Sequence, residues 1–353
     1  MLDYLIVGLG LAGISFCEQL EDYNKSFKVI NDGSQTSSLV AGGLYNPVIL
    51  KRFTLAWNAD VQLRAALPFY RKLETKLGVK LDYKMPVYRK FASIEEQNLW
   101  FEAGDKPRLS PFLSGKIVQN TNLNIEAPFG LGHVLQTGRI DTNCLIKAYE
   151  TSLREQGRLL GETFDFDDFN IYKEHVEYKS INARRIVFAT GFGIKSNPYF
   201  NYLPLNGNKG ELLTIKAPEL KEGNIIKSGV FIIPLGDDLY RVGATYERTN
   251  KSNNPTEGAK KELLDKLHTF LKCGYEIVDH VAGIRPTVAD RRPLVGKHPL
   301  YHNIIVLNGF GSRGVLIAPT VSKQLYDHIE KGELLSPDID VKRFSKRFNT
   351  RLS

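Results

Sequence analysis

The chain has 353 residues, of which 42% are hydrophobic and 24% are charged. These fractions are ordinary for a folded globular protein, and they exclude disordered, collagen-like and disulfide-scaffold chains. Lysine and arginine outnumber aspartate and glutamate by 47 to 39, a formal charge of +8 that does not by itself distinguish anionic substrates from nucleic acid.

At roughly 150 residues per domain, the length predicts about two domains. The cysteines Cys17, Cys144 and Cys273 are odd in number and far apart, which favours a reducing compartment over a disulfide framework. No apolar run approaches the roughly 18 to 20 residues of a membrane span. Residues 1–4 lead straight into an apolar strand without the features of a signal peptide. We therefore expect a cytoplasmic protein with no membrane span.

The N-terminal third predicts strand, turn, helix and strand in that order. Residues 5–7 form a short apolar strand, residues 11–20 have helical spacing, and residues 27–30 form a second strand. A longer amphipathic helix follows at 56–77, and Pro68 predicts a kink inside it.

The predicted type of secondary structure changes twice in the middle of the chain. Residues 79–129 consist of short β-type pieces, such as 87–91, mixed with polar loops. A helix returns at 142–155, with Asp141 as its expected N-cap, and residues 185–189 form another buried strand.

The last part repeats this alternation. Antiparallel-type strands occupy 210–215, 230–234 and 239–244, and a polar helix follows at 256–271. A strand at 303–308 and a helix at 315–330 close the series. This pattern predicts an α/β domain interrupted twice by an α+β domain with an antiparallel sheet.

The first motif is Gly8-Leu9-Gly10-Leu11-Ala12-Gly13, between a strand and a helix, with Asp32 at the end of the next strand. Gly8 permits a tight turn, Gly10 lets a pyrophosphate approach the backbone, and Gly13 allows close helix packing. Asp32 is suited to accept hydrogen bonds from an adenosine ribose. This strand–helix–acid context predicts a Rossmann-type site for NAD or FAD.

Two further stretches bear on that choice. Ala189-Thr190-Gly191 follows a buried strand, as in flavoproteins that close their FAD site there. The small-residue loop Ser37-Ser38-Leu39-Val40-Ala41-Gly42-Gly43-Leu44-Tyr45-Asn46-Pro47 is suited to pass close against a flat ring. Both favour FAD.

A second Gly-rich turn occupies Gly309-Phe310-Gly311-Ser312-Arg313-Gly314-Val315, where a strand gives way to a helix. Backbone N–H groups and the positive end of a helix there would favour the negative charge of a reduced flavin.

Taken together, the chain resembles the D-amino-acid oxidase-like family of FAD-dependent oxidoreductases, especially glycine and sarcosine oxidases and the oxidase half of a bifunctional protein that modifies tRNA wobble uridine. Besides the four stretches above, the matching residues are Gly138–Asp141, Lys209–Glu211, Gly243–Thr245 and Gly283–Pro286. The resemblance implies an FAD-binding domain at 1–78, 134–204 and 286–345, and a substrate-binding domain at 79–133 and 205–285.

The resemblance also implies roles for single residues. Arg285 of the Gly-x-Arg-Pro motif would bind the substrate carboxylate, for which a planar guanidinium is well suited. Arg313 would hold the carboxylate or lie against the flavin edge, so both arginines also count as cofactor contacts. Tyr240 and Tyr246 would flank the pocket floor and hydrogen-bond the substrate. No cysteine occurs in residues 303–320, which favours non-covalent FAD.

The implied reaction oxidises the C–N bond of an amino acid or secondary amine by hydride transfer to the flavin, and dioxygen or another acceptor then reoxidises it. Two alternatives are a flavoprotein acting on an aminomethylated tRNA base and a non-catalytic FAD-binding protein. The basic C-terminal residues Lys342, Arg343, Lys346, Arg347 and Arg351 bear on the first.

Metal binding is not expected. His298 and His302 are four residues apart, but Pro299 lies between them, so a helical metal-binding pair is not predicted.

Overall fold

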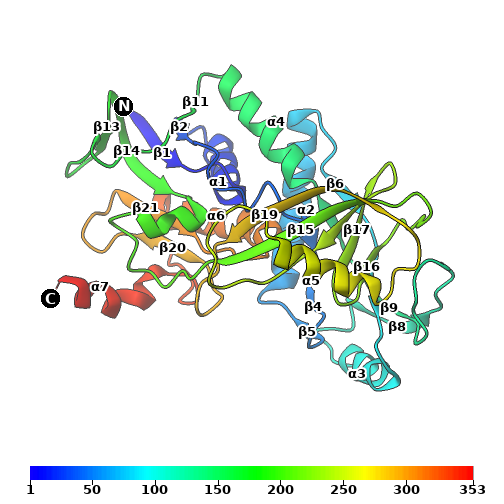
Figure 1. Cartoon of the computed structure of the whole chain (residues 1–353). Coiled ribbons are helices and arrows are strands. Elements are labelled where there is room, and N and C mark those ends of the chain that lie inside the picture. The colour runs from blue at the N-terminus through cyan, green and yellow to red at the C-terminus, as the bar shows by residue number, and fades with distance from the viewer. Residues whose placement is uncertain (353) are drawn as a thin grey trace.

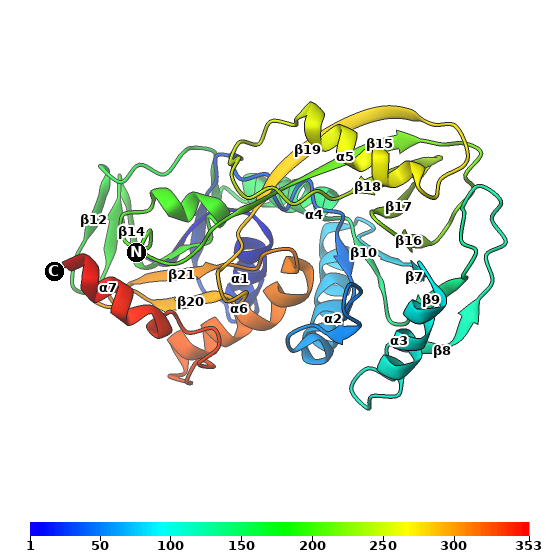
Figure 2. The same ribbon diagram turned by 60° about the horizontal axis from the view of Figure 1, so that its bottom comes forward.

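The computed structural model describes residues 1–352, with side chains as far as Thr350. Within this range the strands form two eight-stranded sheets and two smaller sheets. The two large sheets lie side by side, and helix α5 (Glu257–His268) lies on the second of them (Figures 1 and 2).

The first large sheet has a parallel centre. β1 pairs in parallel with β2 on one edge and with β14 on the other. The far edge of β14 is shared, because its first half pairs with β13 and its second half pairs in parallel with β21. The strands in spatial order are β11 (Leu159–Leu160), β2 (Phe27–Ile30), β1 (Leu2–Val7), β14 (Ile181–Phe188), β13 (Val176–Tyr178) and β12 (Phe169–Ile171), with β21 (Ile304–Asn308) and β20 (Leu294–Lys297) beyond β14.

Helices cover this sheet because its strands are apolar on both faces, as expected for parallel strands. Apolar side chains of α1, α2, α4 and α6 share one core with Ile6, Val187 and Ile305 of the sheet. Leu5 and Ile186 face a second core on the other side, together with Phe200. The helices are α1 (Leu11–Asp22), α2 (Ala59–Leu77), α4 (Thr142–Glu155) and α6 (Gly314–Glu330), and the turn after β14 is the 3-10 helix η1 (Gly191–Ser196).

The second large sheet is antiparallel except for one parallel pair, β16 with β7. Its outer face packs on α5, where Leu213 and Val242 meet Leu263 and Leu267 in a third core. The strands in spatial order are β19 (Glu276–Arg285), β15 (Asn208–Lys216), β18 (Leu239–Gly243), β17 (Phe231–Gly236), β16 (Ile225–Lys227), β7 (Val87–Lys90), β9 (Leu131–Val134) and β8 (Leu113–Val118).

The smaller sheets connect the two large ones. β3 and β6 pair on either side of β10, while β4 and β5 form a short hairpin. These strands are β3 (Leu44–Tyr45), β4 (Val48–Ile49), β5 (Thr54–Leu55), β6 (Asp82–Lys84) and β10 (Gly138–Ile140). The first large sheet takes its strands from within 2–30, 159–188 and 294–308, and the second from within 87–134 and 208–285. The two-domain boundaries themselves stay a prediction.

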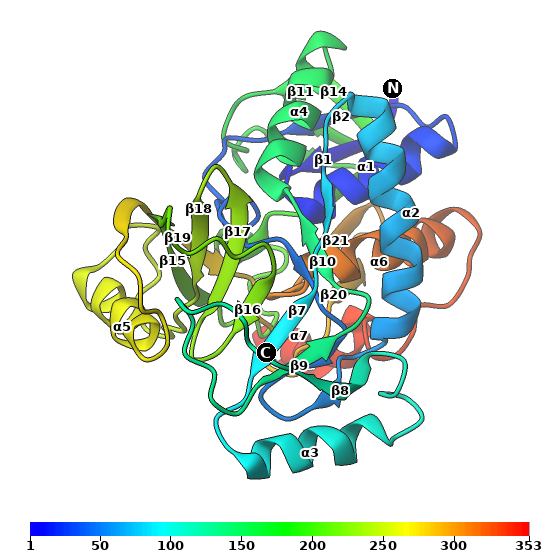
Figure 3. The ribbon, with the colours of Figure 1, turned by 90° about the vertical axis from the view of Figure 1, so that its right-hand side faces the viewer.

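Most predicted elements are present, but three differ from the prediction. Helix α2 begins at Ala59 rather than near residue 56, and it continues through Pro68. Helix α3 (Ile94–Gly104) lies where only β-type pieces and loops were expected, at the edge of the molecule beside β8 (Figure 3). At the C-terminus, η2 (Val341–Phe344) and α7 (Ser345–Leu352) extend beyond the last predicted helix.

The basic C-terminal residues do not all face solvent. Arg343 forms an ion pair with Asp290 at 2.9 Å and donates to the carbonyl of Pro293 at 2.8 Å. Lys346 and Arg347 are exposed on α7, whereas the side chain of Arg351 lies outside the described residues. Arg343 therefore fixes the chain end to the segment before β20.

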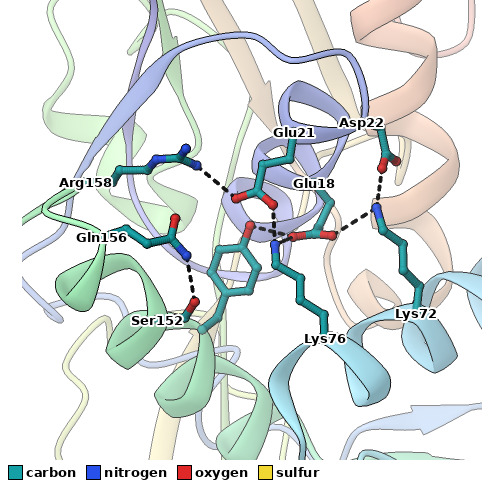
Figure 4. A network of polar contacts seen from close by, with 9 residues as sticks. Glu18, Glu21, Asp22, Lys72, Lys76, Ser152, Gln156 and Arg158 are labelled. Carbon is teal, nitrogen blue, oxygen red and sulfur yellow. Dashed lines mark hydrogen bonds and ion pairs between the residues drawn. The ribbon is translucent and has the colours of Figure 1, made fainter.

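Charged residues tie α1, α2 and α4 together (Figure 4). The ammonium of Lys76 on α2 contacts the carboxylates of Glu18 and Glu21 on α1. The side chain of Glu18 is fully buried, and it also accepts a hydrogen bond from the hydroxyl of Tyr149 on α4 at 2.8 Å. We call these residues the helix network: Glu18, Glu21, Asp22, Lys72, Lys76, Tyr149 and Arg158.

Candidate functional site

The turn between β1 and α1 is built around glycines that leave no room for a side chain. Gly8 has φ of +101°, and a Cβ added there would lie 2.6 Å from the carbonyl oxygen of Ala189. A Cβ at Gly13 would overlap the carbonyl oxygen of Gly8. These contacts bring the start of α1 against the end of β14, the close packing expected of a dinucleotide-binding turn.

Asp32 lies just after β2, beside this turn. Its carboxylate accepts hydrogen bonds from the backbone N–H of Ser34 at 2.9 Å and from the hydroxyl of Thr163 at 3.0 Å. Partial burial raises the pKa of Asp32, but these hydrogen bonds outweigh burial and hold the pKa below its ordinary value. The carboxylate is therefore ionised at neutral pH and exposed enough to accept further hydrogen bonds.

The loop of residues 37–44 passes between the two large sheets. A Cβ on Gly42 would lie 2.8 Å from Ile233 of β17, and one on Gly43 would overlap the carbonyl oxygen of Ile140. On the β19 side, a Cβ on Gly283 would lie 2.7 Å from Val40. Ser38, in the same loop, accepts from the backbone N–H of Leu11 at 3.4 Å. The structure thus brings Ser37, Ser38, Ala41, Gly42, Gly43 and Leu44 alongside the start of α1 and the inner face of the second sheet.

The other predicted turns converge on the same place. Thr190 follows β14 directly, and its hydroxyl is buried without a hydrogen-bond partner among the residues described. At the second Gly-rich turn, Gly309 and Gly311 have φ of +81° and +57°. A Cβ on Gly314 would lie 3.1 Å from Leu11, so α1 and α6 begin side by side.

These features fit FAD. Neither α1 nor α6 carries a side-chain hydrogen bond from its own N-cap residue, Gly10 or Arg313. Two neighbouring helix N-termini attract negative charge, as in a pyrophosphate or a reduced flavin. The unpartnered Thr190 hydroxyl offers a hydrogen bond at the same site.

Arg285 and Tyr246 lie in contact beside these turns, and Arg313 is the N-cap residue of α6. The guanidinium of Arg285 lies 4.6 Å from the centre of the Tyr246 ring. Burial lowers the pKa of both Arg285 and Arg313, and the charge of Tyr246 acts on each pKa in the opposite direction. Both side chains are partly buried, and among the side chains described neither guanidinium forms an ion pair with a carboxylate. The structure therefore holds two partly buried cations without a paired anion.

Polar atoms without charge orient the two guanidinium groups. Nη1 of Arg285 donates to Oδ1 of Asn208 and to the carbonyl oxygen of Thr245, both at 3.2 Å. Nη1 of Arg313 donates to the carbonyl oxygen of Asn46 at 2.8 Å. Such contacts fix the direction of each guanidinium and leave its charge for a ligand.

Tyr240 is not part of this arrangement, so its predicted role needs correction. It is buried on β18 in the core beneath α5, and its hydroxyl accepts from the backbone N–H of Glu222 at 3.2 Å. Side chains alternate along a strand, so Tyr240 faces α5 whereas Arg241 and Gly243 face the other way. Tyr246, which is 69% exposed, lies beyond the end of this strand.

Three residues at the site were missing from the predicted set: Asn46, Asn208 and Thr245. Each contributes a carbonyl or amide oxygen to a guanidinium. Asn46 and Thr245 act through backbone oxygen atoms, which carry no residue-type signal. Asn208 precedes the Lys-Gly-Glu motif, and only its pairing with Arg285 across β15 and β19 reveals its role.

The described residues provide neither a metal-binding cluster nor a membrane-spanning helix. Among residues 1–352, no group of three or more His, Cys, Asp or Glu side chains could hold a metal ion. No helix in that range is long and apolar enough to cross a bilayer.

Comparison with known proteins gives a family and a fold. A family model described as FAD dependent oxidoreductase matches residues 3–328. The solved structure of glycine oxidase from Geobacillus kaustophilus superposes with a TM-score of 0.80 at 19% identity, covering 94% of this chain and 95% of that chain. At that identity the likeness shows the fold, and it confirms the predicted class of an α/β dinucleotide-binding fold with an antiparallel substrate sheet.

Sequence relatives fall into two groups. Glycine oxidase from Geobacillus kaustophilus (strain HTA426) is 24% identical over 361 residues, or 94% of this chain and 93% of that protein. Glycine oxidase from Bacillus subtilis (strain 168) is 28% identical over 159 residues, or 43% of this chain and 42% of that protein. The tRNA 5-methylaminomethyl-2-thiouridine biosynthesis bifunctional protein of Aromatoleum aromaticum is 26% identical over 164 residues, or 40% of this chain and 26% of that protein.

Proposed function

The chain belongs to the family of FAD-dependent oxidoreductases, and we propose that it oxidises the C–N bond of a small amino acid or secondary amine whose carboxylate binds Arg285. The observation that carries this proposal is that two partly buried guanidinium groups form no ion pair with a carboxylate among the described side chains. A buried charge that lacks a counterion is costly, so a protein that retains one has a use for it. An anionic ligand supplies the missing counterion.

Arg285 is the better anchor of the two. Its guanidinium lies over Gly210, where a Cβ would overlap it, and the Tyr246 ring covers it from another side. Held in this way, the planar fork can pair with both oxygens of a carboxylate. Arg313, held by Asn46 at the start of α6, supplies a second positive charge for the carboxylate or the flavin edge. The exposed hydroxyl of Tyr246 is available to the substrate.

The chemistry follows from this placement. FAD, when bound, supplies the acceptor for the hydride that leaves the substrate α-carbon. The substrate amine is neutral when its α-C–H bond breaks, and the product is an iminium ion that water hydrolyses to an oxo acid and an amine. Arg285 and Arg313 orient the substrate and need not remove a proton. Dioxygen or a quinone-type acceptor takes the two electrons afterwards.

The cofactor contacts belong to the same proposal. Asp32 accepts the ribose hydroxyls, Gly10 to Gly13 and the start of α1 hold the pyrophosphate, and the start of α6 faces the flavin ring. The FAD is held without a covalent bond, and the protein is cytoplasmic. Acid precipitation releases FAD into the supernatant if the FAD is bound non-covalently, and leaves a yellow pellet if it is bound covalently.

Anaerobic reduction tests the function. The purified yellow protein is mixed without oxygen with glycine, sarcosine, D-amino acids or L-proline, and the flavin absorbance near 450 nm is followed. Bleaching by one of these carboxylates, and not by methylamine or ethylamine, supports the proposal. Bleaching by the simple amines alone assigns the site to substrates without a carboxylate.

A second candidate substrate is a modified tRNA base, which the tRNA-modifying relatives and one surface feature favour. A hollow of about 620 Å³ between the β4–β5 hairpin and α3 is lined by four basic residues, Lys51, Arg52, Lys106 and Arg108, and by the acidic Glu96 and Glu102. Phosphate contacts by such residues give an affinity that falls steeply with salt. Binding of tRNA that weakens with salt and with Arg52→Glu, but not with Lys261→Glu on α5, supports this candidate.

A further inference from the structure

A fully buried ion pair lies on the strand that supports Arg285. Lys209 and Glu211 of β15 are both inaccessible to solvent, and Nζ of Lys209 lies 3.2 Å from Oε1 of Glu211. A Cβ added at Gly210, between them, would project from the opposite face of the strand, where the guanidinium of Arg285 lies. The ion pair therefore lies on the face of β15 opposite to the face that contacts Arg285, the proposed substrate anchor.

The two charged side chains hold the far end of one segment, residues 245–256, which we call the strap. Nζ of Lys209 donates to the carbonyl oxygen of Asn254 at 2.5 Å. The carboxylate of Glu211 accepts from the backbone N–H of Thr256 at 2.8 Å and from its hydroxyl at 3.0 Å. His280 on β19 lies 3.0 Å from the same carboxylate. The strap is thus fixed just before α5 begins.

The near end of the strap is fixed to the same two residues through their backbone. Lys209 and Glu247 exchange two backbone hydrogen bonds of 2.8 and 2.9 Å. The N–H of Glu211 donates to the hydroxyl of Thr245 at 3.0 Å. Thr245 and Tyr246, at this end, are the residues whose carbonyl and ring hold Arg285.

We propose that the Lys209–Glu211 pair is a positioning device that keeps Arg285 in place by fixing the far end of the strap, whose near end is held by the backbone of the same two residues. This inference rests on the proposed function, in which Arg285 anchors the substrate carboxylate. A buried ion pair contributes little net stability compared with apolar side chains of the same size, so its directional bonds are the better reason for its presence. Apart from the contact of Glu211 with His280, those bonds go to the strap, and Thr245 and Tyr246 of the strap hold the guanidinium.

The strap also reaches the cofactor side of the molecule. The side-chain amide of Asn253 donates to the carbonyl oxygen of Ser34 at 3.1 Å, two residues after Asp32. The same segment therefore contacts the loop assigned to the FAD ribose and the residue assigned to the substrate carboxylate.

Chemical modification of Arg285 tests the device without needing a substrate. Phenylglyoxal reacts with accessible guanidinium groups, and mass spectrometry of peptides gives the rate at Arg285 in the FAD-loaded protein. We expect Glu211→Gln and Lys209→Met to raise this rate. In the same proteins, the affinity for glycolate, a carboxylate without a C–N bond, should fall about tenfold in a titration of the flavin absorbance.

Lys76→Met is the matched control, because it also breaks a buried ion pair but lies in the helix network, away from the strap. It should lower the melting temperature and leave both the modification rate and the glycolate affinity unchanged. Thr256→Val, which removes one hydrogen bond to Glu211 together with the α5 N-cap bond from Ala259, gives a milder change in the same direction if the charged variants do not fold.

The outcomes separate this inference from the proposed function. If Arg285→Met leaves glycolate affinity unchanged, the proposed anchor is wrong. If Arg285→Met weakens glycolate binding but the folded strap variants change neither measurement, the positioning device is wrong. An equal effect of Lys76→Met on the modification rate also overturns it, because general loosening then explains the result.

Discussion

Two regions of the molecule bury charge in opposite ways. In the helix network, three carboxylates and three cations from α1, α2 and the segment after α4 neutralise one another (Figure 4). Beside the Gly-rich turns, Arg285 and Arg313 donate to neutral oxygen atoms, Arg285 also lies over the Tyr246 ring, and neither is paired with a carboxylate among the described side chains. The first region is complete in itself, whereas the second needs an anion.

This difference teaches how to distinguish structural charge from functional charge. Both regions contain buried ionic side chains, so burial alone does not identify a site. The net charge of the cluster identifies a site. A structural cluster gains nothing from an excess of one sign of charge, whereas a binding site uses that excess to attract its ligand. The following predictions test this distinction.

The largest expected effect is on substrate binding by Arg285→Met, which removes the excess charge. The loss should be about 2 to 5 kcal/mol, while Arg285→Lys should lose less because it keeps the charge without the planar fork. Anaerobic titration with the substrate that bleaches the flavin gives both values. FAD content should stay normal, and if the Met variant binds substrate as the wild type does, the excess charge at Arg285 has another purpose.

Lys76→Met should have the opposite effects, namely a loss of stability without a loss of substrate affinity. It leaves Glu18 and Glu21 each with one cation fewer, and the free energy of unfolding should fall by about 1 to 3 kcal/mol. Chemical denaturation measures the loss, and substrate affinity should not change. A change in affinity without a loss of stability would remove the distinction between the two regions.

Asp32→Ala tests the cofactor half of the site. Hydrogen bonds from a ligand to an ionised acceptor contribute on the order of 1 to 3 kcal/mol, so FAD affinity should fall by that amount. The protein is stripped of FAD and titrated with it while fluorescence quenching is followed. Thr163→Val, which removes one partner of Asp32 without removing the carboxylate, is the control and should bind FAD nearly as well.

The smallest effect concerns Glu330, a second internally neutralised carboxylate. Burial raises its pKa, but hydrogen bonds from Lys25 and Tyr4 and the charge of Arg185 outweigh burial, so the folded-state pKa lies below the ordinary value of 4.5. This carboxylate therefore stabilises the fold above the unfolded-state pKa, and the contribution is lost as pH falls through the folded-state pKa. The melting temperature, measured between pH 6 and 3 at about one-unit steps, should decrease less with falling pH for Glu330→Gln than for the wild type. Parallel curves would mean that Glu330 titrates alike in both states.

The sequence predicted the parts of the molecule that local chemistry determines. The turn at Gly8–Gly13 requires residues without side chains, and helix α4 has the residue bounds that its spacing and Asp141 indicated. Helix α3 was missed because its apolar residues do not form a regular stripe. Its N-terminus did carry a signal, since Ser93 caps the N–H of Glu96 and Glu96 accepts in return from Ala92.

Site residues were predictable from the sequence only where the type of side chain indicates a function. Arg285 and Tyr246 are in contact, and their roles stay a prediction. Tyr240 points into a core because a strand alternates its faces and the sequence did not show which face was inner. The contacts that orient the arginines are backbone carbonyls and Asn208, and only the register of β15 against β19 identifies them.

The adjacency of α1 and α6, where Gly314 meets Leu11, has a consequence for how the protein is made. The proposed cofactor site takes one part from α1 and another from α6, which are far apart in sequence. β1 likewise cannot complete the centre of its sheet until β14 has been synthesised. A nascent chain therefore cannot hold its flavin at this site before α6 has been synthesised, and chains that stop before α6 should be colourless.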